Sequence, residues 1–155
     1  MKTHVKFVKI FFFFLILLFF LACEEELYSP VPDVRVNLTI DLSLQDADLI
    51  PTLATKTFTK PRLEIDRIGF GGILIINGYS TNGEANLFAY DLACPVEANS
   101  SVKVIPDDIG KAKCPKCEAI YSIAYGTGMP ESKSKYPLKS YAVRKIGEKK
   151  YNVLN

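Results

Sequence analysis

The chain has 155 residues, a formal net charge of +2 and a single histidine, His4. Residues 1–22 hold three of the 19 basic residues and none of the 17 acidic ones, so the rest of the chain is close to neutral. This balance excludes the strongly basic surface with which proteins bind nucleic acid. Because His4 also lies in residues 1–22, the remainder has no imidazole to serve as a catalytic base or a metal ligand.

The first 22 residues have the pattern of an export signal. Three lysines precede an apolar run of twelve residues, from Ile10 to Leu21, which is shorter than the roughly 20 residues of a membrane-spanning helix. Residues 20–23 read F-L-A-C and resemble a bacterial lipobox, in which the cysteine is lipidated and becomes the new N-terminus; an uncleaved short anchor is the alternative. We predict a lipoprotein signal peptide over residues 1–22 and lipidation at Cys23.

Residues 23–33 are predicted to be the lipidated N-terminus and an extended tether. They contain three consecutive glutamates, 24–26, and two prolines, a composition typical of a solvated linker. The acidic run after the lipidated cysteine resembles the surface-export signals of Bacteroidota lipoproteins; a plain spacer is the alternative. We therefore expect a protein of the bacterial cell envelope, anchored by its lipid to the membrane, with the outer membrane or the cell surface favoured.

Residues 34–155 show the patterns of many short strands. Apolar residues alternate with polar ones from Val34 to Leu44, which predicts a half-buried strand. Residues 52–59 suggest a short strand. The continuous apolar run between Ile68 and Gly78 predicts a strand buried on both faces, bent at its start by glycines.

The second half of the chain continues in the same way. Further strands are expected at residues 86–92, around 102–105 and at 119–125, whereas residues 126–137 are expected to form a loop. Residues 141–146 and 151–153 suggest a closing hairpin, in which Gly147 and Glu148 form a two-residue type II′ turn. Since no segment shows a sustained helical period, we predict an all-β, antiparallel sandwich or barrel.

Three cysteines remain in the predicted domain, and they lie in two short loops. Cys94 follows a predicted strand, and after nineteen intervening residues Cys114 and Cys117 occur in the sequence C-P-K-C-E-A-I-Y-S. This arrangement resembles the two cluster-binding loops of Rieske iron–sulfur domains, C-x-H and C-P-x-H-G-[SA]-x-[FY]-[DS]. Residues 128–130, G-M-P, resemble the proline loop of that family, and the likeness extends over about residues 63–153.

The resemblance implies a Rieske-like antiparallel β-sandwich over residues 34–155, with a small cluster-binding subdomain made of two hairpin loops. In the family, two cysteines hold one iron of a 2Fe–2S cluster and two histidines hold the other. Here Val96 occupies the first histidine position and Cys117 the second, so both histidine ligands are replaced. A further departure is Glu118, which stands where the family has a glycine.

The cysteines allow three main interpretations. Cys94 forms a disulfide with Cys114 or Cys117, as an oxidising exported compartment favours. Alternatively, the three thiolates hold zinc or iron, with Glu97 or Glu118 as a possible fourth ligand. In the third interpretation they hold an atypical 2Fe–2S cluster, which normally takes four protein ligands.

We predict a lipid-anchored accessory or binding module of the cell envelope, with a degenerate Rieske-like domain stapled by its cysteines and no cofactor. The alternative is an atypical 2Fe–2S electron-transfer component that uses Cys94, Cys114 and Cys117. An independent enzyme is not expected, since no catalytic residues stand out. The predicted partners are the membrane, through the lipid, and an unknown protein; nucleic acid is not among them.

Overall fold

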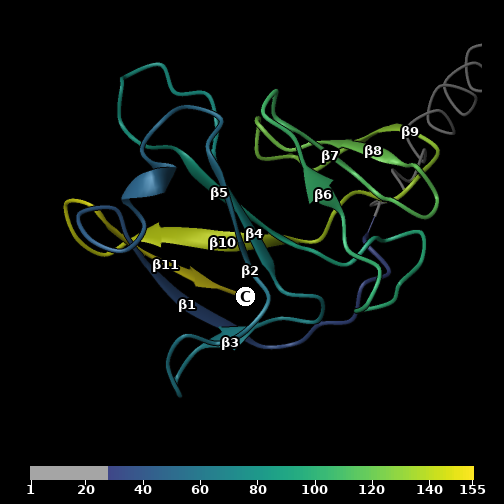
Figure 1. Ribbon diagram of the computed structural model, residues 1–155, viewed down its shortest axis with the longest axis horizontal. Helices are drawn as coiled ribbons and strands as arrows, with labels where there is room; N and C mark the ends of the chain where they lie inside the picture. Colours follow the sequence, from purple (N-terminus) through teal and green to yellow (C-terminus); the bar gives the residue numbers. More distant parts are fainter. Residues whose placement is uncertain (1–27) are drawn as a thin grey trace, which may run out of the picture.

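The computed structural model describes residues 28–155 (Figure 1). The predicted signal peptide, the predicted lipidation site at Cys23 and the start of the tether lie outside the described residues. Within residues 28–155, no helix combines the length and the apolar character that crossing a membrane would require.

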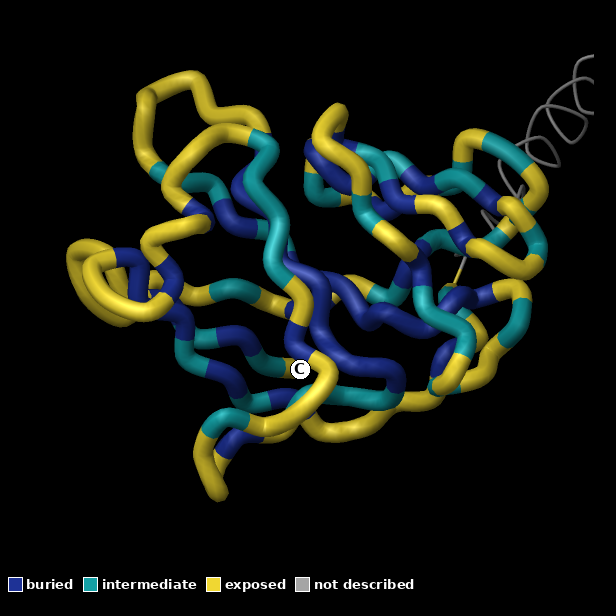
Figure 2. The backbone as a smooth tube through the Cα atoms, viewed as in Figure 1, coloured by how far each residue is buried: buried dark blue, intermediate teal, exposed yellow. Residues whose placement is uncertain are grey.

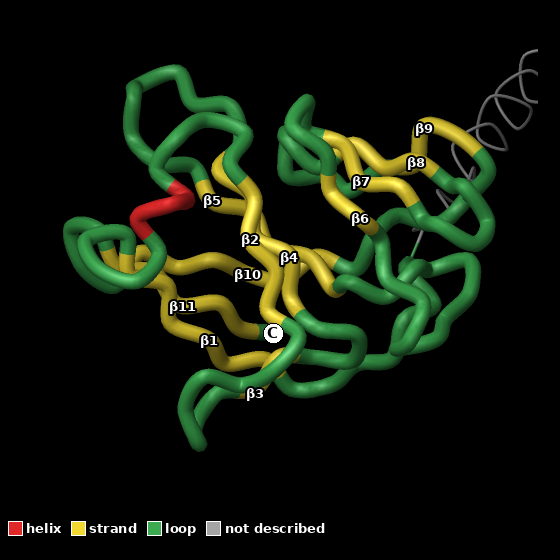
Figure 3. The backbone as a smooth tube through the Cα atoms, in the orientation of Figure 1, coloured by secondary structure: helices red, strands yellow, loops and turns green. Residues whose placement is uncertain are grey.

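The described chain is built from antiparallel strands in two sheets, and its only helical element is a short 3₁₀ turn, η1 (Ala47–Leu49), coloured red in Figure 3. The larger sheet has the order β2-β4-β5-β10-β11-β1-β3 and contains β1 (Val36–Asp41), β2 (Thr55–Phe58), β3 (Arg67–Ile68), β4 (Ile73–Asn77), β5 (Leu87–Asp91), β10 (Ser140–Lys145) and β11 (Lys150–Leu154). The smaller sheet has the order β6-β7-β8-β9 and contains β6 (Ile105–Pro106), β7 (Lys111–Lys113), β8 (Ile120–Ser122) and β9 (Pro130–Ser132). The predicted all-β, antiparallel fold class is confirmed.

Strand β10 joins the two halves of the larger sheet. Its first residues pair with β5, with Tyr141 opposite Ala89, whereas its later residues pair with β11, with Val143 opposite Val153. The sheet therefore folds over at β10, and one core is enclosed by side chains from both halves. Its members include Leu38 and Val153 from one half and buried residues of β2, β4 and β5 from the other.

The smaller sheet covers the opposite face of β4 and β5, where a second core lies. Ile73 and Ile75 of β4 belong to the first core, and Leu74 and Ile76 belong to the second, so all five residues of this strand are buried. Figure 2 shows buried chain, in dark blue, through the middle of the molecule, where Figure 1 places β4. The strand predicted between Ile68 and Gly78 is confirmed over Ile73–Asn77, where both faces are buried, whereas Ile68 belongs to the separate strand β3.

The alternating strand predicted at residues 34–44 is shorter than expected. Strand β1 covers residues 36–41, where the inward side chains Val36, Leu38 and Ile40 are buried. Leu44 is 75% exposed, because the chain turns after Asp41, whose carboxylate accepts a hydrogen bond from the amide of Ser43. The alternation thus continues in the sequence beyond the point where the strand ends.

The loop predicted at residues 126–137 contains a strand, β9, and that part of the prediction is wrong. Pro130 and Pro106 begin or end the two outermost strands of the smaller sheet, β9 and β6. Proline has no amide hydrogen to donate, so it is tolerated at a sheet edge, where it also discourages pairing with another chain. The prolines that obscured these strands in the sequence suit their position at the edges.

The final hairpin is present, but its predicted type II′ turn is wrong. The amide groups of Ile146 and Gly147 both donate to the carbonyl of Lys150, so three residues, 147–149, connect the paired positions. A type II′ turn needs a positive φ at its first central residue, and Gly147 is not among the described residues with a positive φ.

Candidate functional site

Backbone hydrogen bonds fix the positions of Cys94 and Cys114. Cys94 follows β5, and its amide donates a 2.9 Å hydrogen bond to the carbonyl of Val102. Cys114 and Cys117 lie in the connection between β7 and β8, where the amide of Cys114 donates to the carbonyl of Ala119 over the same distance. The smaller sheet therefore supplies one loop, and the end of β5 supplies the other.

The structure brings the three cysteine sulfur atoms together. All three Sγ atoms lie within 4.8 Å of one another, and those of Cys94 and Cys117 are 3.6 Å apart. Cys94 and Cys114 are fully buried, whereas Cys117 is half-buried. All three are free thiols, so two loops that are distant in the sequence present three sulfur ligands to one point.

The two loops have the same backbone turn. The amide of Ala98 donates to the carbonyl of Cys94 at 2.8 Å, and that of Glu118 donates to the carbonyl of Cys114 at 3.0 Å. Both donors have a positive φ, 46° at Ala98 and 60° at Glu118. This conformation favours glycine, so both loops hold a side chain where a glycine would be less strained. Glu118 is the residue that departs from the glycine of the Rieske pattern.

The three thiols differ in their electrostatic surroundings. Burial works against the thiolate of Cys114, but hydrogen bonds from the amides of Cys117 and Lys116 and from the other thiols hold its pKa below the ordinary value. Burial, with a smaller contribution from the neighbouring thiols Cys114 and Cys94, raises the pKa of Cys117 to about 12 against the lowering effect of the Ala119 amide. Of these two thiols, Cys114 is therefore the one favoured as a thiolate.

Tyr121 lies directly beside this thiol cluster. Its hydroxyl group lies 3.6 Å from the Sγ atom of Cys94, and its side chain is fully buried. Strand β9 runs alongside β8, and Pro130 is paired with Tyr121. Residues 128–130 therefore lie next to the thiol cluster. No role was predicted for Tyr121 itself, although it belongs to the I-Y-S motif after Cys117.

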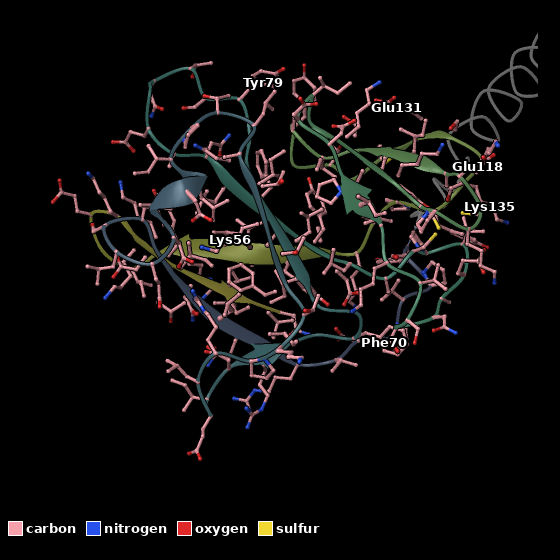
Figure 4. The ribbon with its side chains drawn as sticks, viewed as in Figure 1. Lys56, Phe70, Tyr79, Glu118, Glu131 and Lys135 are labelled. Carbon is pink, nitrogen blue, oxygen red and sulfur yellow. The ribbon has the colours of Figure 1, made fainter. Side chains whose placement is uncertain are left out.

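The two candidate carboxylate ligands are each paired with a lysine. Glu97 in the first loop forms an ion pair with Lys116 in the second loop, and Glu118 forms one with Lys133. Neither carboxylate belongs to the group of ligand atoms that lie within 4.8 Å of one another. Figure 4 shows Glu118 at one end of the smaller sheet. The Glu97–Lys116 pair joins the loop tips independently of the cysteines.

The donor set does not match that of a histidine-ligated Rieske centre. Val96, at the first histidine position, is 42% exposed and has no donor atom, and the described residues contain no histidine. Three sulfur atoms are one fewer than the four protein ligands that a 2Fe–2S cluster takes. These residues therefore supply only three of the four ligands of a 2Fe–2S cluster. A fourth would be available only if Glu97 or Glu118 broke its ion pair with a lysine.

A buried carboxylate holds the base of the first loop, and sequence reasoning missed it. Asp91 is fully buried and accepts hydrogen bonds from the amides of Phe70 (2.9 Å), Gly71 (2.9 Å) and Ala93 (2.7 Å), and from the hydroxyl of Tyr141. Phe70 is labelled at the lower right of the molecule in Figure 4. Since Ala93 directly precedes Cys94, this network fixes the position from which the first loop departs.

Comparison with known proteins gives two kinds of result. No family model and no curated protein sequence matches the chain. Among solved structures, the complex of reduced oxygenase and oxidized ferredoxin in carbazole 1,9a-dioxygenase is similar at 17% identity and a TM-score of 0.45, covering 77% of this chain and 93% of that one. The ferredoxin of carbazole 1,9a-dioxygenase from Nocardioides aromaticivorans IC177 is similar at 15% identity and a TM-score of 0.41, covering 78% of this chain and 95% of that one. Neither likeness is close enough to assign a ligand or a partner to this chain.

Proposed function

We propose that this protein is a lipid-anchored accessory or binding module of the bacterial cell envelope. In this proposal, Cys23 carries the lipid, residues 24–33 form the tether, and the β domain is a Rieske-like domain that has lost both histidine ligands. Its cysteines staple the tips of the two loops, and the stapled end is presented to a protein partner at the same membrane. The proposal requires no catalytic residues and no bound cofactor.

The staple is a proposed disulfide between Cys94 and Cys117, and one observation supports it. The Sγ atoms of these residues are 3.6 Å apart, although the residues lie 23 positions apart in different loops. A disulfide is about 2.05 Å long, so small rotations of the two side chains would form it. Closing a loop of this size stabilises a fold by about 3 kcal/mol in the chain-entropy model. An oxidising exported compartment, which the predicted signal peptide implies, would favour the bond.

The alternative is an atypical 2Fe–2S electron-transfer component that uses Cys94, Cys114 and Cys117. The presence of three sulfur ligands in two adjoining loops supports it, whereas the 3.6 Å spacing of two of them counts against it. A fourth ligand would have to come from Glu97 or Glu118, and either residue would first have to release its lysine. A centre with sulfur in place of imidazole would have a lower reduction potential than a Rieske centre.

The two functions are distinguished by a thiol count and a metal analysis on the same sample. The full chain is expressed in a bacterium that exports it, purified without reductant, alkylated and digested. We expect one linked peptide pair containing Cys94 and Cys117, a single alkylated thiol at Cys114, and less than one-tenth of an iron per chain. Three alkylated thiols, together with stoichiometric iron and an EPR signal after reduction, would contradict the staple and support the alternative.

The anchor needs a separate test. Labelling of expressing cells with a fatty-acid analogue should mark the full chain, and Cys23→Ser should abolish the label. Cys94→Ser is the matched control, because it also removes one thiol but lies outside the predicted lipobox. Label on Cys23→Ser, or none on the unmodified chain, would show that the predicted lipidation is wrong.

A further inference from the structure

The arrangement of the three thiols suits one small ion rather than a two-iron cluster. In a 2Fe–2S centre the protein ligands divide between two irons, so ligands on different irons lie farther apart than ligands on the same iron. Cys117, which occupies the second histidine position, would belong to the second iron in that pattern. Its sulfur is instead 3.6 Å from that of Cys94.

The spacing of the sulfur atoms agrees with a single ion. At a metal–sulfur distance of about 2.3 Å, three sulfur ligands around one ion form a triangle with sides of about 4 Å. The three Sγ atoms all lie within 4.8 Å of one another. One ion at their centre would therefore require only small side-chain adjustments.

We propose that, when its thiols are reduced, this site binds one thiophilic monovalent ion, Cu(I), through Cys94, Cys114 and Cys117 in three-coordinate, all-sulfur ligation. The inference rests on the same thiol cluster as the proposed staple and specifies what the reduced cluster holds. Thiolate ligands select soft ions such as Cu(I), which is satisfied by three of them, whereas structural zinc is almost always held by four ligands.

The neighbouring oxygen donors are engaged elsewhere, which favours an ion with three ligands. Glu97 and Glu118 are held by Lys116 and Lys133, and neither lies within the group of clustered ligand atoms. The described residues contain no histidine. Within the described chain, no histidine or carboxylate therefore lies ready to fill the fourth position that zinc, or a harder ion, would need.

Each of the three sulfur atoms has a backbone or side-chain hydrogen-bond donor beside it. The amides of Lys116 and Cys117 donate to the sulfur of Cys114, and the amide of Ala119 donates to that of Cys117. The hydroxyl of Tyr121 lies 3.6 Å from the sulfur of Cys94. Each thiol thus has a hydrogen-bond donor that would orient it as an ion ligand.

The loops that carry the ligands are already held in place. Both make the same hydrogen-bonded turn, from Ala98 to Cys94 and from Glu118 to Cys114, and the Glu97–Lys116 ion pair links their tips. Binding would therefore need little reorganisation, since the ligands are fixed by packing and hydrogen bonds before the ion arrives.

The test is a titration of the fully reduced full chain, in detergent and without oxygen, with Cu(I) against a chromophoric Cu(I) chelator. The Cys23→Ser variant serves as the reference, so that only the three clustered thiols are available. We expect one Cu(I) per chain, and X-ray absorption should show three sulfur neighbours and no nitrogen or oxygen. Cys94→Ser, Cys114→Ser and Cys117→Ser should each weaken binding by more than the roughly 10–100-fold that loss of an outer-shell partner costs.

Glu118→Gln is the matched control and should bind Cu(I) as the reference does, because it leaves the Glu97–Lys116 pair between the loop tips intact. Failure of the reduced chain to bind Cu(I), or binding that includes an oxygen ligand and is lost in Glu118→Gln, would overturn the inference. If no Cu(I) binds but the Cys94–Cys117 linked peptide is found in the exported protein, this inference fails while the proposed staple stands. If Cu(I) binds but the linked peptide is absent, the staple fails instead.

Discussion

The hydroxyl of Tyr141 lies 2.6 Å from a carboxylate oxygen of Asp91, and both side chains are buried in the described domain. This bond connects β10 to the end of β5, three residues before Cys94. The same carboxylate also accepts from the amide groups of Phe70, Gly71 and Ala93. A buried charge is tolerated here because four donors replace the water that it loses.

Tyr141→Phe should destabilise the protein by about 1.5–3 kcal/mol, the usual worth of a hydrogen bond to a charged group. The phenyl ring would still fill the core, so the loss would come from the missing donor to Asp91. Urea unfolding of the full chain measures it. Tyr125→Phe is the control, since Tyr125 is 67% exposed and its loss of a hydroxyl should change the stability by less than about 0.5 kcal/mol. Equal effects of the two substitutions would contradict the prediction.

The stability should fall as the pH rises above about 10. Burial raises the pKa of Tyr90, Tyr121 and Tyr141 well above the usual value, with Asp91 adding to the effect at Tyr141 and Cys94 at Tyr121. In the unfolded chain these phenols ionise near pH 10, whereas in the folded chain they stay neutral, so their contribution is complete below pH 10 and is lost above it.

Each of these tyrosines should lower the free energy of unfolding by about 1.4 kcal/mol per pH unit above this point. Urea midpoints measured from pH 8 to pH 11 would show the slope. Tyr90→Phe should make the slope shallower by about 1.4 kcal/mol per pH unit, the contribution of one tyrosine. A free energy of unfolding that stays constant to pH 11 would contradict this prediction.

Glu118→Gly should be more stable than Glu118→Ala by about 1 kcal/mol, because φ at this position is 60° and a side chain is strained there. Both variants lose the ion pair with Lys133, so their difference reports the backbone alone. The same pair of substitutions at Glu131, which lies in β9 and also pairs with a lysine, should give the opposite order. The measurement is the free energy of unfolding of the four variants. If the alanine variant were the more stable one at both positions, the prediction would be wrong.

Gly71→Ala should destabilise the protein by about 2–3 kcal/mol and disturb the first loop. A Cβ atom at Gly71 would lie 2.5 Å from the amide nitrogen of Ala93 and 2.7 Å from a carboxylate oxygen of Asp91. Because Ala93 precedes Cys94, we also expect less of the Cys94–Cys117 linked peptide. Gly147→Ala is the control, with its nearest neighbour at 3.4 Å. An unchanged stability and an unchanged yield of linked peptide would contradict the prediction.

The sequence patterns located best the strands that bury either one face or both faces in a hydrophobic core. The alternation from Val36 to Ile40 located β1, and the continuous apolar run at residues 73–76 located a strand buried on both faces. The edge strands β6 and β9 were harder to place, because they are short and contain proline. Their existence depends on pairing with β7 and β8, which no local pattern records.

The cysteines could be picked out from their spacing and from the likeness to the Rieske loops, but their neighbours could not. The partners of Asp91 lie 2 to 50 positions away, so a carboxylate at the end of a strand carried no local sign of burial. Likewise, nothing local indicated that Lys116 would bind Glu97 across the two loops. The Glu97–Lys116 pair depends on how the smaller sheet packs against β4 and β5, whereas the Asp91 network depends on the pairing of β5 with β10 in the larger sheet.

Strands β4 and β5 contribute to both hydrophobic cores at once: Ile75 and Ala89 face one, while Ile76 and Tyr90 face the other. If either core unfolded, the strands β4 and β5 that enclose the other core would lose their packing on one face. The cysteine-bearing end should therefore not melt ahead of the main sheet, and a heat scan should show a single transition in which both lose their structure together.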